Sequence, residues 1–133
     1  MSSSIHGIGT DIVETSRIAD SIERYGDRFL DRVFTAAERA YCDGMKHPAR
    51  HYAARFAAKE AVAKAFGTGF GADLNWTDVE VIRHPGGQPA IVLHGIGRET
   101  AARLGIGRIH VSLSHADHYA TATAWAEKGD PPA

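Results

Sequence analysis

The sequence predicts a single α+β domain in which one long helix and several shorter helices pack on a small antiparallel sheet. Helical patterns fill the first half of the chain, strand patterns with hairpin turns fill most of the second half, and a very alanine-rich segment joins them. A chain of 133 residues is long enough for one hydrophobic core but not for two. We expect that core to cover about residues 5–127, with a short flexible tail on either side.

The first half is predicted to hold one strand and four helices. The expected ranges are residues 5–13, 15–25, 27–33, 35–42 and 49–66. Thr15 or Ser16 is expected to cap the first helix, and Thr35 with Glu38 forms a capping box at the third. Seven alanines between positions 53 and 65 favour the long helix and permit close packing, and Gly67 is expected to end it.

The second half is predicted to hold two pairs of strands and one helix. The expected ranges are residues 76–83 and 88–94, the helix 96–104, and then 108–114 and 119–127. A proline and two glycines between positions 84 and 87 indicate the hairpin turn of the first pair. No repeat or linker interrupts the pattern, so we expect one domain over residues 1–133.

Composition narrows the class of protein. The net charge of −1 provides no general field for nucleic acid or a membrane surface, and no run of 18 apolar residues predicts a membrane span. A single cysteine, Cys42, excludes an internal disulfide and is typical of a reducing compartment. The first residues lack a signal-peptide pattern. We therefore expect a cytoplasmic protein without a nucleic-acid or membrane partner.

Three charged residues carry the chemical signal. Asp11 shares one face of the first strand with Gly7 and Gly9, which we expect to let a bulky ligand approach the backbone. Glu60 and Lys64 are four residues apart, about one helical turn, so they leave the long helix on one face. Mg²⁺ is commonly held by one or two carboxylates together with substrate phosphates. If the strand meets that helix face, the cluster suits Mg²⁺ and a phosphate ester.

The same residues also have an ordinary structural interpretation. Glu60 and Lys64 alone form an i, i+4 helix pair worth about 0.2–0.5 kcal/mol. Asp11 alone is a turn or capping residue near Thr15. Spacing by itself therefore leaves both interpretations open.

Five ordered motifs resemble those of the holo-acyl-carrier-protein synthases, the small bacterial 4′-phosphopantetheinyl transferases. The motifs are Gly-Ile-Gly-Thr-Asp-Ile-Val-Glu at 7–14, Phe-Thr-x-x-Glu at 34–38, Arg-Phe-x-Ala-Lys-Glu-Ala-x-x-Lys-Ala-x-Gly-Thr-Gly at 55–69, Gly-x-Pro at 87–89 and Ser-Leu-Ser-His-x-x-x-Tyr-Ala at 112–120. They cover nearly the whole predicted domain. One such motif would be weak evidence, whereas five in the family's order are specific.

The resemblance implies the phosphopantetheinyl transferase fold and transfer of phosphopantetheine from coenzyme A to a serine of apo-acyl carrier protein, for fatty acid biosynthesis. By motif match, Asp11 and Glu60 bind Mg²⁺, and Lys64 contacts the transferring or leaving phosphate. Either Glu60 or a metal-bound hydroxide takes the serine proton. Larger, surfactin-type transferases carry a second acidic ligand where this chain has Val13, and Glu14 is expected on the face away from Asp11.

Further residues are expected to bind the substrates. The candidates for coenzyme A are Arg55, Lys64, His115, Gly87, Pro89 and Lys46. The first helix resembles the family's docking element for the acidic carrier protein, and on an ideal helix its candidates Arg17, Arg24 and Arg28 lie within about 40° of one another. An apolar stripe roughly 100° away is expected to face the core: Ile18, Ile22, Tyr25 and Phe29. Solvated surface charge is the alternative for the basic residues.

The resemblance also implies a homotrimer with active sites between subunits. Two other functions stay open. One is a transferase specialised for carrier domains of polyketide or peptide synthases, which kinetics on both kinds of carrier would separate. The other is a non-catalytic coenzyme A-binding module, which the intact set of Asp11, Glu60 and Lys64 argues against.

Overall fold

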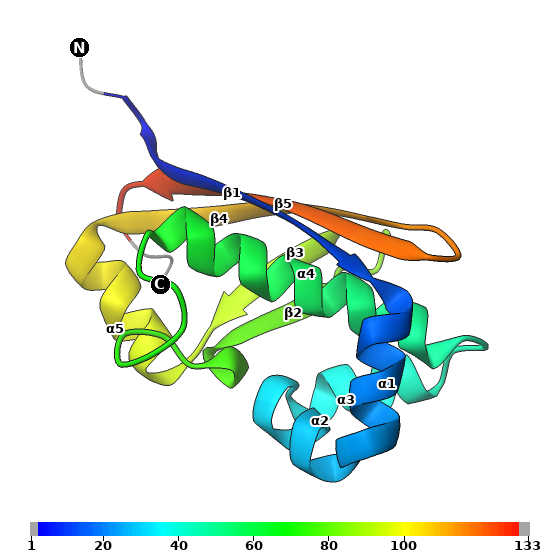
Figure 1. Ribbon diagram of the computed structural model, residues 1–133. Coiled ribbons are helices and arrows are strands. Elements are labelled where there is room, and N and C mark those ends of the chain that lie inside the picture. Colours follow the sequence, from blue (N-terminus) through cyan, green and yellow to red (C-terminus); the bar gives the residue numbers. More distant parts are fainter. Residues whose placement is uncertain (1–2, 131–133) are drawn as a thin grey trace.

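The computed structural model describes residues 3–130 and contains five helices, five strands and one 3-10 helix in that range (Figure 1). In chain order these are β1 (Ile5–Glu14), α1 (Thr15–Tyr25), α2 (Asp27–Val33), α3 (Ala36–Asp43), α4 (Pro48–Phe66), η1 (Trp76–Asp78), β2 (Val79–Arg83), β3 (Pro89–Leu93), α5 (Gly95–Leu104), β4 (Ile106–His115) and β5 (Tyr119–Lys128). All the expected elements are present, with bounds shifted by a few residues at most. Within the described range, no helix has the length and apolar character that crossing a membrane requires.

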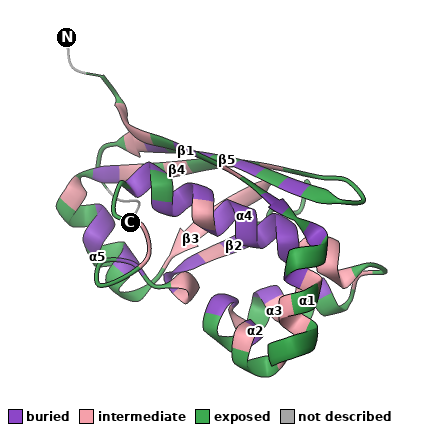
Figure 2. Ribbon diagram, viewed as in Figure 1, coloured by how far each residue is buried: buried purple, intermediate pink, exposed green. Residues whose placement is uncertain are grey.

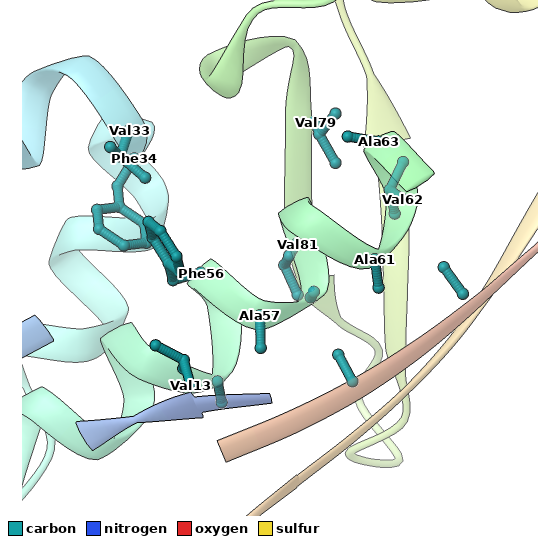
Figure 3. Packing of buried hydrophobic residues seen from close by; sticks show 14 of the residues in the cluster. Val13, Val33, Phe34, Phe56, Ala57, Ala61, Val62, Ala63, Val79 and Val81 are labelled. Atoms are coloured by element: carbon teal, nitrogen blue, oxygen red, sulfur yellow. The ribbon is translucent and has the colours of Figure 1, made fainter. Parts of the chain in front are cut away.

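The long helix α4 lies between two antiparallel sheets (Figure 1). The sheet β1–β5–β4 covers one side, with β5 in its centre, and the hairpin β2–β3 covers the other. Val13 of β1 and Val81 of β2 pack near α4 from these two sides (Figure 3). Of the 19 residues of α4, 13 are buried. The α+β class is confirmed, but the strands form two sheets because a helix buried nearly all round must be covered on both sides.

Gly7 and Gly9 bring β1 directly against the backbone of α4. A Cβ atom on Gly9 would lie 1.9 Å from the carbonyl oxygen of Ala61, and one on Gly7 would lie 2.1 Å from that of Ala65. No side chain fits in such a gap. The expectation that these glycines open the strand to a ligand is therefore wrong, because the space they leave is filled by the helix.

The two faces of the β1–β5–β4 sheet differ in character. The residues of β5 that face α4 are all buried alanines: Ala120, Ala122, Ala124 and Ala126. The opposite face is largely open to solvent (Figure 2) and carries four large exposed apolar residues: Ile8, Ile12, Tyr119 and Trp125. Within residues 3–130, no element covers that face. Small residues thus let helix and sheet approach closely on one side, while large apolar ones stay exposed on the other.

A buried ion pair ties α3 to α4 and to β2. The Nζ of Lys59 lies 2.8 Å from Glu38 Oε1, and both side chains have 0% exposure. Lys59 also donates to the carbonyls of Trp76 and Val79, while the backbone N–H of Val81 donates to Glu38 Oε2 at 2.8 Å. Glu38 belongs to the predicted capping box of α3, which is confirmed. These hydrogen bonds give partners to most of the polar atoms of the buried ammonium and carboxylate, which offsets much of the cost of removing the two charges from water.

The first helix differs from the prediction at both ends. Thr15 is the first residue of α1 instead of its cap, and Glu14 precedes it without a side-chain capping bond. Glu14 is exposed, as Ile12 is. At the other end, Tyr25 is 51% exposed, because Gly26 with φ 54° turns the chain between α1 and α2 and interrupts the apolar stripe.

The two predicted flexible tails are partly ordered. The backbone N–H of Lys128 donates to the Ser4 carbonyl at 2.7 Å, and that of Gly129 donates to Gly105 at 2.9 Å. Lys128 is the last residue of β5, so the domain extends slightly further than expected. The remainder of the tails, residues 1–2 and 131–133, lies outside the described residues.

Candidate active site

Lys64 reaches from α4 across to β1. Its Nζ lies 3.1 Å from Asp11 Oδ1 and donates to the Thr10 carbonyl at 2.9 Å. Lys64 can reach Asp11 because β1 lies very close to α4 at Gly9. A Cβ on Gly9 would come within 2.8 Å of the Lys64 Cβ. The Lys64 side chain is 52% exposed and that of Asp11 is 18% exposed. The strand and the helix face therefore meet as the sequence predicts, with the ammonium at the surface.

Glu60 joins this pair as a second carboxylate. It lies one turn before Lys64 on α4 and is half-buried. Burial raises the pKa of Glu60, the nearby charge of Asp11 raises it further, and Lys64 and Arg17 act in the opposite direction. Two carboxylates that repel each other in a partly buried position favour a bound cation, because the ammonium of Lys64 offsets only part of their charge.

The donor set of Asp11 and Glu60 fits a hard divalent cation. It consists of carboxylate oxygens, and Mg²⁺ is commonly held by one or two carboxylates, with waters and substrate phosphates completing its octahedron. Within residues 3–130, no group of three or more His, Cys, Asp or Glu comes together that could hold a metal ion alone. Most of the coordination shell would therefore come from water and from a phosphate-bearing substrate.

A cationic cavity of about 230 Å³ lies elsewhere on α4 and collects four predicted coenzyme A residues. They are Arg55 of α4, Gly87 and Pro89 of the β2–β3 hairpin, and His115 at the end of β4. Arg55 is 4% exposed, with its Cζ 4.1 Å from the ring centre of Tyr41. Its Nε finds no hydrogen-bond partner within residues 3–130. A buried guanidinium with a free donor favours an anion in this cavity.

Two further basic residues of the cavity were missed by the sequence analysis. His51 lies one helical turn before Arg55 on α4, and Arg83 ends β2. The i, i+4 spacing of His51 and Arg55 is a signal that could have indicated a shared face. Arg83 donates to the Gly87 carbonyl at 3.2 Å and to the Tyr41 hydroxyl at 2.7 Å. That link depends on the folded hairpin and has no signal in the sequence.

Two of the predicted coenzyme A residues lie outside the cavity. Lys46 is exposed in the loop between α3 and α4 and is not among the residues that line the cavity. Lys64 belongs to the carboxylate pair instead of the cavity.

The carboxylate pair and the cationic cavity are on different sides of α4. Glu60 and Arg55 are five residues apart, which places their side chains about 140° apart on a helix. Asp11 is on β1 and His115 is on β4, and these are the two edges of the three-stranded sheet. Within one chain, the helix therefore separates the two parts.

The whole arrangement matches a known family. The model of the 4′-phosphopantetheinyl transferase superfamily matches residues 7–124 of this chain. The chain belongs to this superfamily. The relationship that the motifs indicated is thereby confirmed.

Individual members of the superfamily are closely similar over their full length. A holo-[acyl-carrier-protein] synthase of Koribacter versatilis (strain Ellin345) is 50% identical over 123 residues, which are 92% of this chain and 98% of the relative. The crystal structure of holo-[acyl-carrier-protein] synthase from Neisseria meningitidis has a TM-score of 0.88 at 33% identity and covers 93% of this chain and 99% of that one. The Helicobacter pylori holo-[acyl-carrier-protein] synthase in complex with coenzyme A has a TM-score of 0.81 at 30% identity. The match covers 90% of this chain and 99% of that one.

Four of the five motifs supply residues to the two parts of the candidate site. The first and third supply Asp11, Glu60 and Lys64, while the third, fourth and fifth supply Arg55 and the other predicted residues of the cationic cavity. The second motif supplies Glu38, which is buried against Lys59. That motif therefore supports α4 from the core and contacts neither the carboxylate pair nor the cavity.

The predicted arginine surface is smaller than expected. Arg17 and Arg24 line a shallow hollow along α1 and the end of β1, which they share with three carboxylates: Glu14, Asp20 and Glu23. Arg28 does not line this hollow. It lies on α2, beyond the turn at Gly26, so the ideal-helix alignment of the three arginines does not hold. Two of the three remain on a common surface.

Proposed function

We propose that this chain transfers the 4′-phosphopantetheine group of coenzyme A to a serine of apo-acyl carrier protein, giving holo-acyl carrier protein and adenosine 3′,5′-bisphosphate, in fatty acid biosynthesis. The observation that carries the proposal is the cluster of Asp11, Glu60 and Lys64 where β1 meets α4. Relatives that share half of the residues are holo-[acyl-carrier-protein] synthases, and a similar structure holds coenzyme A.

Asp11 and Glu60 are the residues that would hold Mg²⁺. When bound, the ion supplies positive charge to the pyrophosphate of coenzyme A. Lys64 adds a point charge beside them, and its 52% exposure leaves donors free for a phosphate oxygen in addition to its contacts with Asp11 and Thr10. Negative charge grows on the leaving bisphosphate during phosphoryl transfer, so fixed positive charge at this place lowers the barrier.

The reaction exchanges one phosphorus–oxygen bond for another. The serine oxygen bonds to the phosphorus that carries the pantetheine arm, and the bond from that phosphorus to the adenosine 5′-phosphate oxygen breaks. The serine proton must leave as the new bond forms. We assign this proton to Glu60, a half-buried carboxylate of the cluster; burial and the charge of Asp11 raise the pKa of Glu60 in the metal-free protein.

The adenosine end of coenzyme A is assigned to the cationic cavity. Its 3′-phosphate would accept hydrogen bonds from Arg55 and His115, with Gly87 and Pro89 flanking the adenine. Lys46 is too exposed to define this subsite and would add at most a solvated charge near it.

We infer that the active unit is a homotrimer in which neighbouring chains complete each site. The carboxylate pair and the cavity are on different sides of α4. Two neighbouring chains can therefore contact one coenzyme A molecule at both places more readily than a single chain can. The exposed apolar residues Ile8, Ile12, Tyr119 and Trp125 provide a surface for this contact. Light scattering should give three chains per particle, and Trp125→Glu should give monomers with little activity.

Arg17 and Arg24 are assigned to the carrier protein. Acyl carrier proteins are acidic, and the hollow that these arginines line opens beside the end of β1, the strand that carries Asp11.

The cytoplasmic location stays a prediction that rests on Cys42. This residue is a buried free thiol, and burial raises the pKa of the thiol to about 12.

The decisive experiment is mass spectrometry of apo-acyl carrier protein incubated with coenzyme A, Mg²⁺ and the enzyme. The carrier should gain the mass of phosphopantetheine, and Asp11→Ala or Glu60→Ala should prevent the gain. A carrier that stays unmodified, or one that is modified equally by these variants, would refute the mechanism. Parallel kinetics on a polyketide-synthase carrier domain would test the specialised alternative.

A further inference from the structure

A pair of histidine rings lies at the wall of the cationic cavity. The ring centres of His51 and His115 are 5.1 Å apart and the rings meet edge to face at 65°. The His51 ring also meets the ring of Tyr41 edge to face, at 5.9 Å. His51 therefore sits between an aromatic ring of α3 and an imidazole of β4, and it lines the same cavity as Arg55.

The groups that surround His51 are nearly all basic. Arg50 and Arg55 approach from α4, Arg83 from β2 and His115 from β4. The nearby carboxylate is that of Asp117, in the turn after β4, and it is paired with Arg50 at 3.1 Å. Among the described residues that line the cavity, none is Asp or Glu. A positive charge on His51 thus has no anionic partner in the cavity.

This environment disfavours the protonated form of the His51 imidazole. Burial lowers its pKa, and the charges of His115, Arg55, Arg83 and Arg50 lower it further. A phosphate dianion in the cavity would reverse the sign of the local field and favour the protonated ring. Binding of such an anion and protonation of His51 would then be linked.

Coenzyme A carries a suitable anion. Its pyrophosphate adjoins the bond that breaks and so belongs with Asp11, Glu60 and Lys64. The remaining phosphate is the monoester on the 3′ oxygen of adenosine, which is close to a dianion at neutral pH because its second pKa is about 6. The cavity, with its buried Arg55 and an unpartnered Nε, is a cationic place that suits this phosphate.

We propose that His51 is a specificity-determining residue of this enzyme: its imidazole takes up a proton when the 3′-phosphate of coenzyme A enters the cavity next to Arg55 and His115, so that binding of this phosphate strengthens as the pH falls from about 8 to about 6.5. The inference rests on the proposed function, since it assumes that coenzyme A is the ligand. His51 shares with Arg55 the discrimination between coenzyme A and an analogue that lacks the 3′-phosphate. Uptake of one proton changes the dissociation constant by at most about tenfold per pH unit.

The test is calorimetric titration of the full-length protein with adenosine 3′,5′-bisphosphate and, separately, with adenosine 5′-phosphate, at several pH values and in buffers of different ionisation enthalpy. The variant His51→Phe keeps a ring next to Tyr41 and His115 but cannot be protonated. His51→Gln is a second variant in case the first disturbs folding. His118→Gln removes an exposed histidine of the turn between β4 and β5 and serves as the matched control.

For the wild type and for His118→Gln, we expect affinity for the bisphosphate to rise roughly three- to tenfold between about pH 8 and about pH 6.5, with net proton uptake. In His51→Phe, the rise in affinity and the proton uptake should each shrink by at least half. The wild type and all the variants should bind adenosine 5′-phosphate with the same affinity. Titration of the ligand itself is common to all variants and cancels in the comparison. Equal pH dependence in wild type and both His51 variants, or an equal loss with adenosine 5′-phosphate, would overturn the proposal.

Phosphopantetheine transfer is measured separately by the mass of the carrier protein. An enzyme that shows the linked proton uptake but does not modify the carrier would contradict the proposed reaction and leave the role of His51 intact. An enzyme that modifies the carrier with the same dependence on pH in wild type and His51→Phe, and takes up no linked proton, would contradict the role of His51 alone.

Discussion

Lys59 and Glu38 form an ion pair of 2.8 Å inside the core, with no exposure of either side chain. Lys59 immediately precedes Glu60 on α4, and successive helical residues point about 100° apart. Because Lys59 also donates to the carbonyls of Trp76 in η1 and Val79 in β2, these contacts help to fix the rotation of α4 that places Glu60 on the side of Asp11. The core thus positions one carboxylate of the candidate site.

Lys59→Met should lower the free energy of unfolding by about 3–5 kcal/mol, because it leaves the Glu38 charge buried without its partner. Urea denaturation followed by circular dichroism measures the change. Lys64→Met is the matched control, since its ion pair with Asp11 is half exposed and contributes at most about 1 kcal/mol. Equal losses in the two variants would contradict a structural role for the buried pair.

Gly9→Ala should destabilise the fold by about 1–3 kcal/mol or more, because the added methyl group would overlap the Ala61 carbonyl and push β1 away from α4. Gly44→Ala is the same substitution at the end of α3, where φ is −79° and the nearest atom would lie 3.5 Å from the new Cβ. Thermal melting should show a clear drop for Gly9→Ala and little change for Gly44→Ala. A tolerated Gly9→Ala would show that helix and strand are not in close contact.

Glu60→Gln should lower the transfer rate on the order of 10²-fold or more and yet stabilise the metal-free protein at neutral pH. The pKa of Glu60 is raised in the folded state, so the folded protein binds more protons than the unfolded one between the ordinary value and the raised one. Stability is therefore lost as the pH rises through that window, and the amide avoids this loss.

Melting temperatures in a metal-free buffer test the sign of this effect. The variant should melt above the wild type at pH 7, and the difference should vanish below the ordinary pKa of Glu60, 4.5, where both side chains are neutral. Glu99→Gln on the exposed side of α5 is the control and should change neither activity nor melting. A less stable Glu60→Gln at pH 7 would contradict the repulsion between Glu60 and Asp11.

Arg17→Glu together with Arg24→Glu should raise the KM for carrier protein roughly fivefold or more, equivalent to about 1 kcal/mol, and change the KM for coenzyme A less, since only Arg17 acts on Glu60. The two arginines share one hollow, whereas Arg28 lies outside it. Arg28→Glu should therefore have a smaller effect. Steady-state kinetics with each substrate varied in turn measures both constants, and equal effects on the two KM values would refute a docking role.

Much of the fold was predictable because its signals are local. Helix caps, glycines that end helices and apolar periodicity all depend on residues a few positions apart. These signals correctly predicted α2, the capping box of Thr35 and Glu38, and the end of α4 at Gly67. The faces of Asp11 and Lys64 on their own elements were predicted as well, but the contact between the two elements was only a condition, which the structure meets.

By itself, the sequence determined the order of the elements, the family and the three charged residues of the candidate active site. Only the tertiary structure decided that β1 pairs with β5, that Gly7 and Gly9 admit a helix instead of a ligand, and that His51 and Arg83 share a cavity with His115. The physical reason is that periodicity shows which face a residue occupies but not what packs against that face. Contacts between segments far apart in the chain form only when the shapes of whole elements fit together.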